Sequence, residues 1–463
     1  MSLALLAAAP MMAACERVTG VDAPPQPVIA SATVAHDAGN ALAATFTAAV
    51  QHADSVAVRY RLTAAASPGW LTTPAAAVGG GTVTLPVLGL LPEQSYELRL
   101  IAWGKGAAIE SESRALTTGA LPADLPHFLA SGAGPAPGFI VFAAGRYGVV
   151  IDNSGRVVWY RRFDDGTGLA FMAEPNGHYA LRPPTPTVGD IEPWVEVDPS
   201  GAVTRTLSCA RGLQPRPHDL LLDPDGSYLI FCDETRTMDL SALGGVANAR
   251  VTGTVLQRIG ANGSLLFEWN PFDHFAITDL PLAERTGASV NWTHGNAFDR
   301  DVDGNYILSF RSLSEITKVD ATTGAVIWRL GGGRNEFNFP GLAPPAFVHQ
   351  HGLRVAGDGT LLLLDNIGDP LASRAERYAI DPVQRVARLV QSYASLPSVV
   401  TEIGGSVQPV AGGHVLVSFG TAGRVEEYDA SGRVVWRIDG DAGYVFRAQR
   451  ILSLYAPGVG TTR

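Results

Sequence analysis

The chain has 463 residues, of which 46% are hydrophobic and 17% charged, enough for more than one domain with a sizeable core. Its 34 basic and 44 acidic residues give a net charge of −10, which argues against a nucleic-acid partner. With 51 glycines, 31 prolines and short apolar runs bounded by turn residues, the sequence predicts an all-β protein.

The first 22 residues predict a signal or lipoprotein segment. An apolar run at 3–9 precedes Met12-Ala13-Ala14-Cys15, and a small-residue site after an apolar run is typical of secretion signals. Cys directly after Ala-Ala resembles a bacterial lipobox. We therefore expect an extracytoplasmic protein, on the periplasmic side, anchored to a bacterial membrane through a lipid on Cys15. The alternative is a disordered alanine-rich terminus, and no Lys or Arg precedes the apolar run.

Residues 23–120 read as short alternating strands, such as "SVAVRYRL" and "SYELRLIAWG", after a proline-rich linker. The stretch "LLPEQSYELRLIAWG" resembles the tyrosine corner of fibronectin type III domains, in which the hydroxyl, here of Tyr96, bonds back to the upstream backbone. We expect a small fibronectin type III-like β-sandwich without catalytic residues, acting as a spacer or as the dimerisation domain of a homodimer.

Residues 121–463 repeat two alternating phrases. One is a turn followed by an apolar strand, as in "DPDGSYLIF", "DVDGNYILSF" and "AGDGTLLLL"; the other leads into a strand that often ends in Trp, as in "TTGAVIWRLGG" and "ASGRVVWRIDG". Copies lie about 50 residues apart, which is typical of a β-propeller with four strands per blade. The pattern predicts six blades, with five or seven as alternatives, and "YVFRAQRIL" at 444–452 as the strand that closes the ring.

Two cysteines follow Cys15. Cys209 and Cys232 both fall at strand ends of nearby repeats. In an oxidising compartment they could form a disulfide. Two buried thiols are the alternative.

The repeat places a histidine at one equivalent position in three successive units. His218 precedes Gly226 by eight residues, and His351 precedes Gly359 by eight. His294 precedes its turn glycine by ten, which fits a two-residue insertion. Because the strand that opens each unit is the innermost one, we expect the three imidazoles to meet at one end of the central channel.

Three kinds of site compete for these histidines. A structural histidine repeated in every blade would require recurrence around the ring, and here it occurs in three units. A metal site suits three histidines, but Asn296 and Arg311 would crowd a cation. An oxyanion site uses the donors present: Arg311, at the end of the strand after His294, together with Asn296 and the imidazoles.

The segment "WTHGNAFDRDVDGNYILSFRSLSEITKVDATTGAVIWRLGG" resembles the core signature of bacterial arylsulfate sulfotransferases, with W-x-H-x-N, a strand ending in S-x-R, and I-x-W-x-L-G-G. "PHDLLLDPDGSYLI" resembles the preceding His-Asp segment of that family, and "FVHQHGLRVAGDGTLLLLDN" the following Gln-His segment. The resemblance extends over about 205–450.

The resemblance implies a six-bladed propeller enzyme that moves a sulfuryl group from a phenolic sulfate ester to a phenolic acceptor. It implies a sulfohistidine intermediate and no use of phosphoadenylyl sulfate as a cofactor. We expect no metal to be required, because a sulfate monoester carries less charge than a phosphate monoester. His351 corresponds to the nucleophile, and His218, His294, Asn296 and Arg311 to its helpers. His349 is a rival nucleophile, but it lies outside the eight-residue spacing.

Which of His218 and His294 donates the proton stays open. Three aromatic residues, Trp194, Trp292 and Phe347, either stack on the substrate or pack in the core. The competing functions are a metal-dependent propeller hydrolase that uses the same histidines, and a non-catalytic lipoprotein scaffold.

Overall fold

The structure is a computed structural model that describes residues 25–64, 69–184, 191–368, 371–439 and 443–456. The expected signal segment and Cys15 lie outside these ranges. The chain divides into two compact units. The smaller one comprises residues up to Val34 with Phe46–Leu85 and Glu97–Ala115, and the larger one comprises Ala35–Thr45, Pro86–Tyr96 and the chain from Leu116 onward.

The N-terminal strands form two sheets. One has the order β1-β2-β6, and the other has the order β4-β3-β7-β8, with β5 added to β3 and β9 to β7. The strands are β1 Val28–His36, β2 Ala44–Gln51, β3 Ser55–Leu62, β4 Leu71–Thr72, β5 Ala76–Ala77, β6 Gly81–Val87, β7 Ser95–Gly104, β8 Ala107–Glu110 and β9 Arg114–Thr117.

Alternate residues of β2 and β7 are buried, as the period of a strand with one face on a core requires. The tyrosine-corner contact is present, because the hydroxyl of Tyr96 accepts a hydrogen bond from the backbone N–H of Leu91 at 2.8 Å. This bond fixes the entry into β7 against the segment that precedes it.

The larger unit is built from sheets with a core of four antiparallel strands, and two of these sheets carry a fifth strand, so the predicted all-β fold of repeated four-stranded units is confirmed. The strands are β10 Leu129–Gly132, β11 Phe139–Ala144, β12 Tyr147–Ile151, β13 Val157–Arg162, β14 Phe171–Ala173, β15 Tyr179–Leu181, β16 Trp194–Val197, β17 Val203–Leu207, β18 Gln214–Leu222, β19 Tyr228–Met238, β20 Ala249–Ile259, β21 Leu265–Trp269, β22 Ser289–Asn291, β23 Gly295–Arg300, β24 Tyr306–Phe310, β25 Glu315–Val319, β26 Val326–Gly331, β27 His351–Val355, β28 Leu361–Gly368, β29 Ala372–Asp381, β30 Val386–Ala394, β31 Ser406–Val410, β32 His414–Phe419, β33 Arg424–Tyr428, β34 Val434–Asp439 and β35 Ala448–Ile451.

Short 3₁₀ turns lie between the strands, at Ala210–Gly212, Ser241–Leu243, Pro271–Asp273, Ile277–Asp279, Leu282–Glu284, Ala411–Gly413 and Gly420–Ala422. In the part of the chain that the structure describes, no helix has the length and apolar character needed to cross a membrane.

The recurring turn phrases form tight turns closed by an aspartate. In the turns 152–156, 198–202 and 429–433, the aspartate Oδ1 accepts the backbone N–H of the residue two positions later, at 2.9 Å in each case. The glycine three residues after the aspartate has a positive φ in all three turns. An Asp-x-x-Gly phrase therefore fixes where one strand ends and the next begins.

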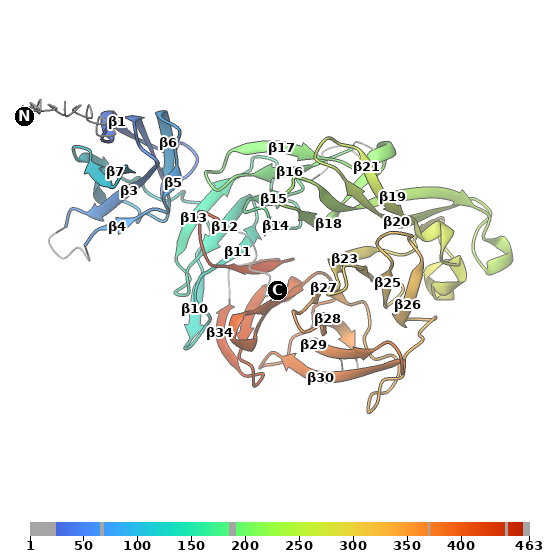
Figure 1. The fold of residues 1–463 in the computed structure, drawn as a ribbon. Helices are drawn as coiled ribbons and strands as arrows, with labels where there is room; N and C mark the ends of the chain where they lie inside the picture. Colours follow the sequence, from blue (N-terminus) through green and yellow to red (C-terminus); the bar gives the residue numbers. More distant parts are fainter. Residues whose placement is uncertain (1–24, 65–68, 185–190, 369–370, 440–442, 457–463) are drawn as a thin grey trace, which may run out of the picture. The chain divides into compact units, whose positions relative to one another are not determined.

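The sheets of the larger unit follow one another around a common centre (Figure 1). Their innermost strands contact one another in the sequence β18, β23, β27, β31, β35 and β14. The two ends of the unit close the circle. β35 pairs with β11 as the innermost strand of the sheet β13-β12-β11-β35, and β10 pairs with β34. The segment predicted to supply the closing strand does so.

Side chains of the innermost strands bind the backbone of the next innermost strand. Each acceptor takes a backbone N–H that lies at a sheet edge and would otherwise lack a partner. The five bonds are Gln408 to Arg450 N, Gln449 to Ala173 N, Glu174 to Leu222 N, Asp219 to Phe298 N and Asp299 to Val355 N, at 2.6–3.1 Å. Carboxylate and amide oxygens of the innermost strands thus join successive sheets.

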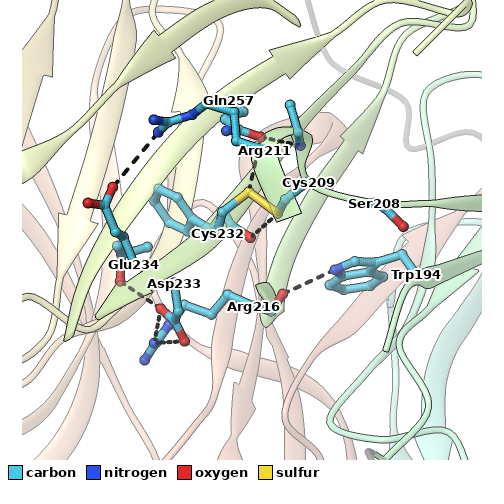
Figure 2. The surroundings of a disulfide bond; sticks show 12 residues. Trp194, Ser208, Cys209, Arg211, Arg216, Cys232, Asp233, Glu234 and Gln257 are labelled. Atoms are coloured by element: carbon cyan, nitrogen blue, oxygen red, sulfur yellow. Dashed lines mark hydrogen bonds and ion pairs between the residues drawn. A yellow bond between two sulfur atoms is a disulfide. The ribbon is translucent and has the colours of Figure 1, made fainter. Parts of the chain in front are cut away.

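Cys209 and Cys232 form a disulfide (Figure 2). Cys209 follows β17, and Cys232 lies in β19, next to Asp233. Of the two alternatives that the sequence left open, pairing is the one observed.

Candidate functional site

The structure brings the three repeat histidines together. His218 lies in β18, His294 directly before β23, and His351 begins β27, so they enter from three adjoining innermost strands. The Nε2 atoms of His218 and His294 are 3.2 Å apart. The ring centroids of His294 and His351 are 6.5 Å apart. The convergence predicted from the repeat alignment is therefore present in the structure.

The backbone at His294 adopts a left-handed conformation, with φ of 48°. Few residues other than glycine adopt it, so the surrounding contacts must hold it in place. The carbonyl of His294 accepts the backbone N–H of Arg311 at 3.0 Å, and the N–H of Gly295 donates to Thr254 Oγ1 at 3.0 Å. These bonds couple the positions of His294 and Arg311.

His218 and His294 form a hydrogen-bonded imidazole pair. Asn291 Nδ2 lies 2.7 Å from His294 Nδ1, so with this amide orientation His294 carries its proton on Nε2 and donates it to His218 Nε2. His218 then carries its proton on Nδ1, and that buried atom has no hydrogen-bond partner among the described residues. Nδ1 of His218 is therefore a hydrogen-bond donor without an acceptor among the described residues.

His351 is almost fully buried, with 1% of its surface exposed. Its Nδ1 lies 2.9 Å from Asn366 Oδ1 and 3.1 Å from the carbonyl oxygen of His349. His349 also has a left-handed backbone, with φ of 54°, and its N–H donates to Ser314 Oγ. The segment that leads into β27 is thus held in one conformation.

Asn296 is completely buried, and its Nδ2 donates to the carbonyl oxygen of Gln350 at 2.6 Å. The contact holds the backbone directly before His351. It differs from the donation to a bound oxyanion that the sequence predicted for Asn296. Asn296 Oδ1 has no partner among the residues that the structure describes.

Arg311 places a positive charge beside the histidines. It is half-buried, and its Nη2 donates to the carbonyl oxygen of Glu402 at 3.3 Å. Within the described ranges it forms no ion pair. A guanidinium keeps its charge at neutral pH even when it is desolvated. The carboxylate of Glu284 lies near the site, with its Oε1 atom 3.9 Å from Nε2 of His349.

Arg216 is a second guanidinium next to the imidazole pair. Its Nη1 donates to both carboxylate oxygens of Asp233, at 2.6 and 2.8 Å (Figure 2). Its Nε donates to the carbonyl oxygen of Gly295. Asp233 follows Cys232 of the disulfide. The disulfide and this ion pair therefore anchor the same stretch of β19.

Burial keeps all three imidazoles uncharged. It lowers the pKa of His351 to about 4, and the charge of Arg311 contributes in the same direction. The pKa values of His218 and His294 lie well below the ordinary value, first because of burial and then because of the charge of Arg216. At neutral pH the site combines neutral imidazoles with positive guanidinium groups, which favours an anion.

Residues 215–441 match the family model described as Arylsulfotransferase (ASST). The predicted resemblance to arylsulfotransferases is confirmed for this segment. It contains His218, His294, Asn296, Arg311 and His351, so all five candidate site residues lie in the arylsulfotransferase segment. A search of curated proteins gave no match.

Solved structures with similar folds are distant. A Bacteroides caccae protein of unknown function aligns with 68% of this chain and 98% of its own, at 11% identity and a TM-score of 0.44. A virginiamycin B lyase from Staphylococcus aureus, solved with quinupristin, aligns with 66% of this chain and 87% of its own, at 10% identity and a TM-score of 0.37. Regucalcin from Agrobacterium tumefaciens aligns with 66% and 79%, at 16% identity and a TM-score of 0.30. Likenesses this weak carry no argument about activity.

Phe446 forms the apolar wall of the site in the arylsulfotransferase-like unit. Its ring stands edge-on to those of His218 and His351, with centroids 5.6 and 6.3 Å away. Tyr444, which is 37% exposed, lies beside Phe446 at 6.3 Å. The aromatic residues singled out in the sequence, Trp194, Trp292 and Phe347, are all buried at 2% exposure or less. They pack in the core rather than facing a substrate.

Sequence reasoning missed the residues that hold the histidines, namely Asn291, Asn366, Arg216 and Phe446. Asn366 ends the stretch "LLLLDN", and Phe446 lies in the segment predicted to close the ring, but nothing in these stretches marks the two residues as contacts of His351. Their roles depend on chain segments that meet only after folding.

A cavity of about 400 Å³ is lined by residues of the same innermost strands. In the strands that carry the histidines, these lining residues follow the histidine in the sequence. Its polar lining includes Glu174, Asp219, Asp299, Arg354 and Arg447. Asp219 forms a bidentate ion pair with Arg354, at 3.0 and 3.1 Å. In the described part of the chain, no group of three or more His, Cys, Asp or Glu residues is arranged to hold a metal ion.

Proposed function

We propose that this protein is an arylsulfate sulfotransferase that carries a sulfuryl group from a phenolic sulfate ester to a phenolic acceptor, by way of a sulfohistidine on His351. The observation that carries the proposal is the half-buried guanidinium of Arg311, which forms no ion pair among the described residues, beside three neutral imidazoles. A sulfate monoester is a monoanion, and it complements this charge. The match of residues 215–441 to arylsulfotransferases supports the same reaction.

In the first half-reaction His351 is the nucleophile. Its Nε2 lone pair attacks the sulfur atom, an N–S bond forms, and the bond between sulfur and the phenolic oxygen breaks with its electron pair on that oxygen. Arg311 binds the sulfuryl oxygens, whose charge shifts during transfer. Removing one such donor typically costs about 3–4 kcal/mol of the barrier.

The His218–His294 pair supplies the proton for the departing phenolate. Bringing a monoanion beside the pair raises its pKa, so the pair takes up one proton from solvent. Two imidazoles whose Nε2 atoms lie 3.2 Å apart cannot both be charged, so the pair carries a single extra proton. That proton passes to the phenolate, which leaves as the phenol.

The second half-reaction reverses the first. The acceptor phenol gives its proton to the imidazole pair, and its oxygen attacks the sulfur. The N–S bond breaks and its electron pair returns to Nε2 of His351. Donor and acceptor therefore use one site in turn, which gives ping-pong kinetics.

For the setting of this chemistry we propose a six-bladed β-propeller preceded by a fibronectin type III-like sandwich. The closed succession of innermost strands and the Tyr96–Leu91 contact support these assignments. We also propose an extracytoplasmic, periplasmic protein anchored through Cys15, with the sandwich available for a homodimer. The disulfide between Cys209 and Cys232 supports an oxidising compartment.

The direct test is incubation of the purified protein with a nitrophenyl sulfate, with and without added phenol. The proposal predicts that nitrophenol release depends on phenol, that phenyl sulfate accumulates in equal amount, and that dialysis against a chelator changes neither. Equal release without phenol would indicate a sulfatase. Activity that is lost on chelation and restored by a divalent metal would indicate the metal-dependent hydrolase.

A further inference from the structure

Asn366 contacts the proposed nucleophile from β28. Its side chain is completely buried, and its Oδ1 lies 2.9 Å from His351 Nδ1. Its Nδ2 donates to the carbonyl oxygens of Thr401 and Gly404, at 2.8 and 2.9 Å. Carbonyl oxygens accept hydrogen bonds and cannot donate them, so the nitrogen end of the amide must face Thr401 and Gly404. The oxygen end is therefore the one that faces His351.

This orientation determines which ring nitrogen of His351 carries the proton. Asn366 Oδ1 can only accept, and the second neighbour of Nδ1, the carbonyl oxygen of His349 at 3.1 Å, can also only accept. A lone pair on Nδ1 would face two acceptors, so Nδ1 must bear the hydrogen. In a neutral imidazole Nε2 then holds the lone pair.

We propose that Asn366 is the positioning residue that locks His351 in the Nδ1–H tautomer, so that Nε2 faces the sulfuryl group as a free nucleophile. The inference rests on the proposed function for the identity of the reaction, and on geometry alone for the tautomer.

The surroundings of Asn366 hold it in this orientation. Ser373 Oγ donates to the backbone carbonyl of Asn366 at 2.6 Å, and the same Oγ accepts the N–H of Thr401 at 2.7 Å. Both residues are buried. Ser373 thus joins β28 to the segment that supplies the two acceptor carbonyls. The amide cannot turn over without breaking these contacts, which makes it a preorganised support.

The amide also suits this position better than a carboxylate would. An Asp side chain would accept the Nδ1–H but could not donate to Thr401 and Gly404. Its negative charge would stabilise the protonated imidazole, which has no lone pair for attack. Asn366 orients the ring and leaves it uncharged.

The first test measures the tautomer without any turnover. In protein carrying ¹⁵N-labelled histidine, NMR of the resting enzyme should show His351 with a protonated Nδ1 and an unprotonated Nε2, assigned by the signals that disappear in His351→Asn. A resting enzyme with a protonated Nε2 on His351 would overturn the inference. This result stands whether or not the protein transfers sulfuryl groups, so it separates failure of the inference from failure of the proposed function.

The second test uses two variants of Asn366. Asn366→Leu removes the acceptor, and we expect kcat to fall about 10- to 100-fold with little change in KM, as is typical for loss of a supporting contact. Asn366→Asp should move the acidic limb of the pH profile upward by about 1 to 3 pH units, because a carboxylate favours the charged ring. The other titratable groups that face His351 are Arg311, His349, His294 and His218, and both variants leave them unchanged.

Gln449→Leu is the matched control, because it removes a buried amide that binds the backbone of Ala173 and touches none of the histidines. It should lower stability and leave the pH profile and the His351 tautomer as in the wild type. An Asn366→Leu enzyme with wild-type kcat and a wild-type tautomer would also overturn the inference. If both Asn366 variants fail to fold, the tautomer of the wild-type enzyme still decides.

Discussion

The imidazole of His351 is buried at 1% exposure, and its environment keeps it neutral at a pH where an exposed histidine is partly charged. That neutrality provides a lone pair, Arg311 provides the attraction for an anion, and the His218–His294 pair provides a place for one proton. Each of these properties belongs to an individual side chain in a particular contact.

Replacing His351 with Asn should remove the nucleophile and lower kcat by about 10⁴-fold or more, as loss of a covalent catalytic group does. The measurement is phenol-dependent nitrophenol release. His36→Asn is the control, since His36 is exposed and lies in β1. Activity of His351→Asn within tenfold of the wild type would assign the nucleophile elsewhere, with His349 the first candidate.

Stability should fall as the pH is lowered through the range in which His351 resists protonation. Its pKa is about 4 in the folded protein and 6.5 by reference, so the unfolded chain binds more protons between these values. From pH 7 to pH 5, His351 alone should cost about 2 kcal/mol of unfolding free energy. Denaturant titrations at both pH values should show a smaller loss in His351→Asn. An equal loss in the two proteins would contradict the assigned pKa.

The sequence alone predicted the histidines that recur in the repeat, but it did not predict the residues that hold them in position. His218, His294 and His351 share one position of a repeat, so their spacing in the sequence predicts that they meet in the fold. Asn366 reaches His351 because β28 and the segment 401–404 meet in the fold, and no local pattern encodes that contact. The backbone bond of Asn296 to Gln350 likewise depends on two different sheets.

For the individual strands, the boundaries follow from turn residues that are close in the sequence. The hydrogen bonds that join one sheet to the next do not follow from such local patterns. Each Asp-x-x-Gly phrase closes its own turn, which is why the strands were predictable from sequence. The innermost strands are joined by acceptors such as Glu174 and Asp299, whose partners lie about 50 residues further along the chain. No local sequence pattern marks these carboxylates as contacts between sheets.

Variants of Glu174 test the hydrogen bond that joins two neighbouring sheets. Its Oε2 accepts the N–H of Leu222 at 2.9 Å, and burial raises its pKa well above the ordinary value. Glu174→Gln keeps an acceptor and avoids the cost of burying an ionisable carboxyl group, so it should be at least as stable as the wild type at pH 7. Glu174→Leu leaves the N–H of Leu222 unsatisfied and should cost about 1–3 kcal/mol. Both values come from denaturant unfolding, and a Gln variant as unstable as the Leu variant would contradict the account.

At the scale of the whole molecule, the larger unit is closed non-covalently by β35 on β11 and by β10 on β34, and braced by the disulfide. The repeat length predicted the closing strand. Sequence could not decide whether the cysteines pair, because pairing depends on how β19 and the segment after β17 meet.

The two cysteines of the disulfide are 23 residues apart in the sequence. Removing the disulfide should lower the free energy of unfolding by about 3 kcal/mol, because the unfolded chain then gains entropy. The comparison is denaturant unfolding of the oxidised protein against the Cys209→Ala, Cys232→Ala double variant. Reductant should destabilise the wild type and leave the double variant unchanged. Two free thiols in protein exported to an oxidising compartment would contradict the pairing.

The central claim is that Nε2 of His351 carries the sulfuryl group between donor and acceptor. The most direct measurement is mass spectrometry of the protein quenched after mixing with nitrophenyl sulfate in the absence of acceptor. The account predicts one sulfuryl increment on the peptide that contains His351, lost on adding phenol and absent in His351→Asn. A wild-type enzyme that transfers the group to phenol without ever carrying this increment, or that carries it on a different residue, would contradict the account.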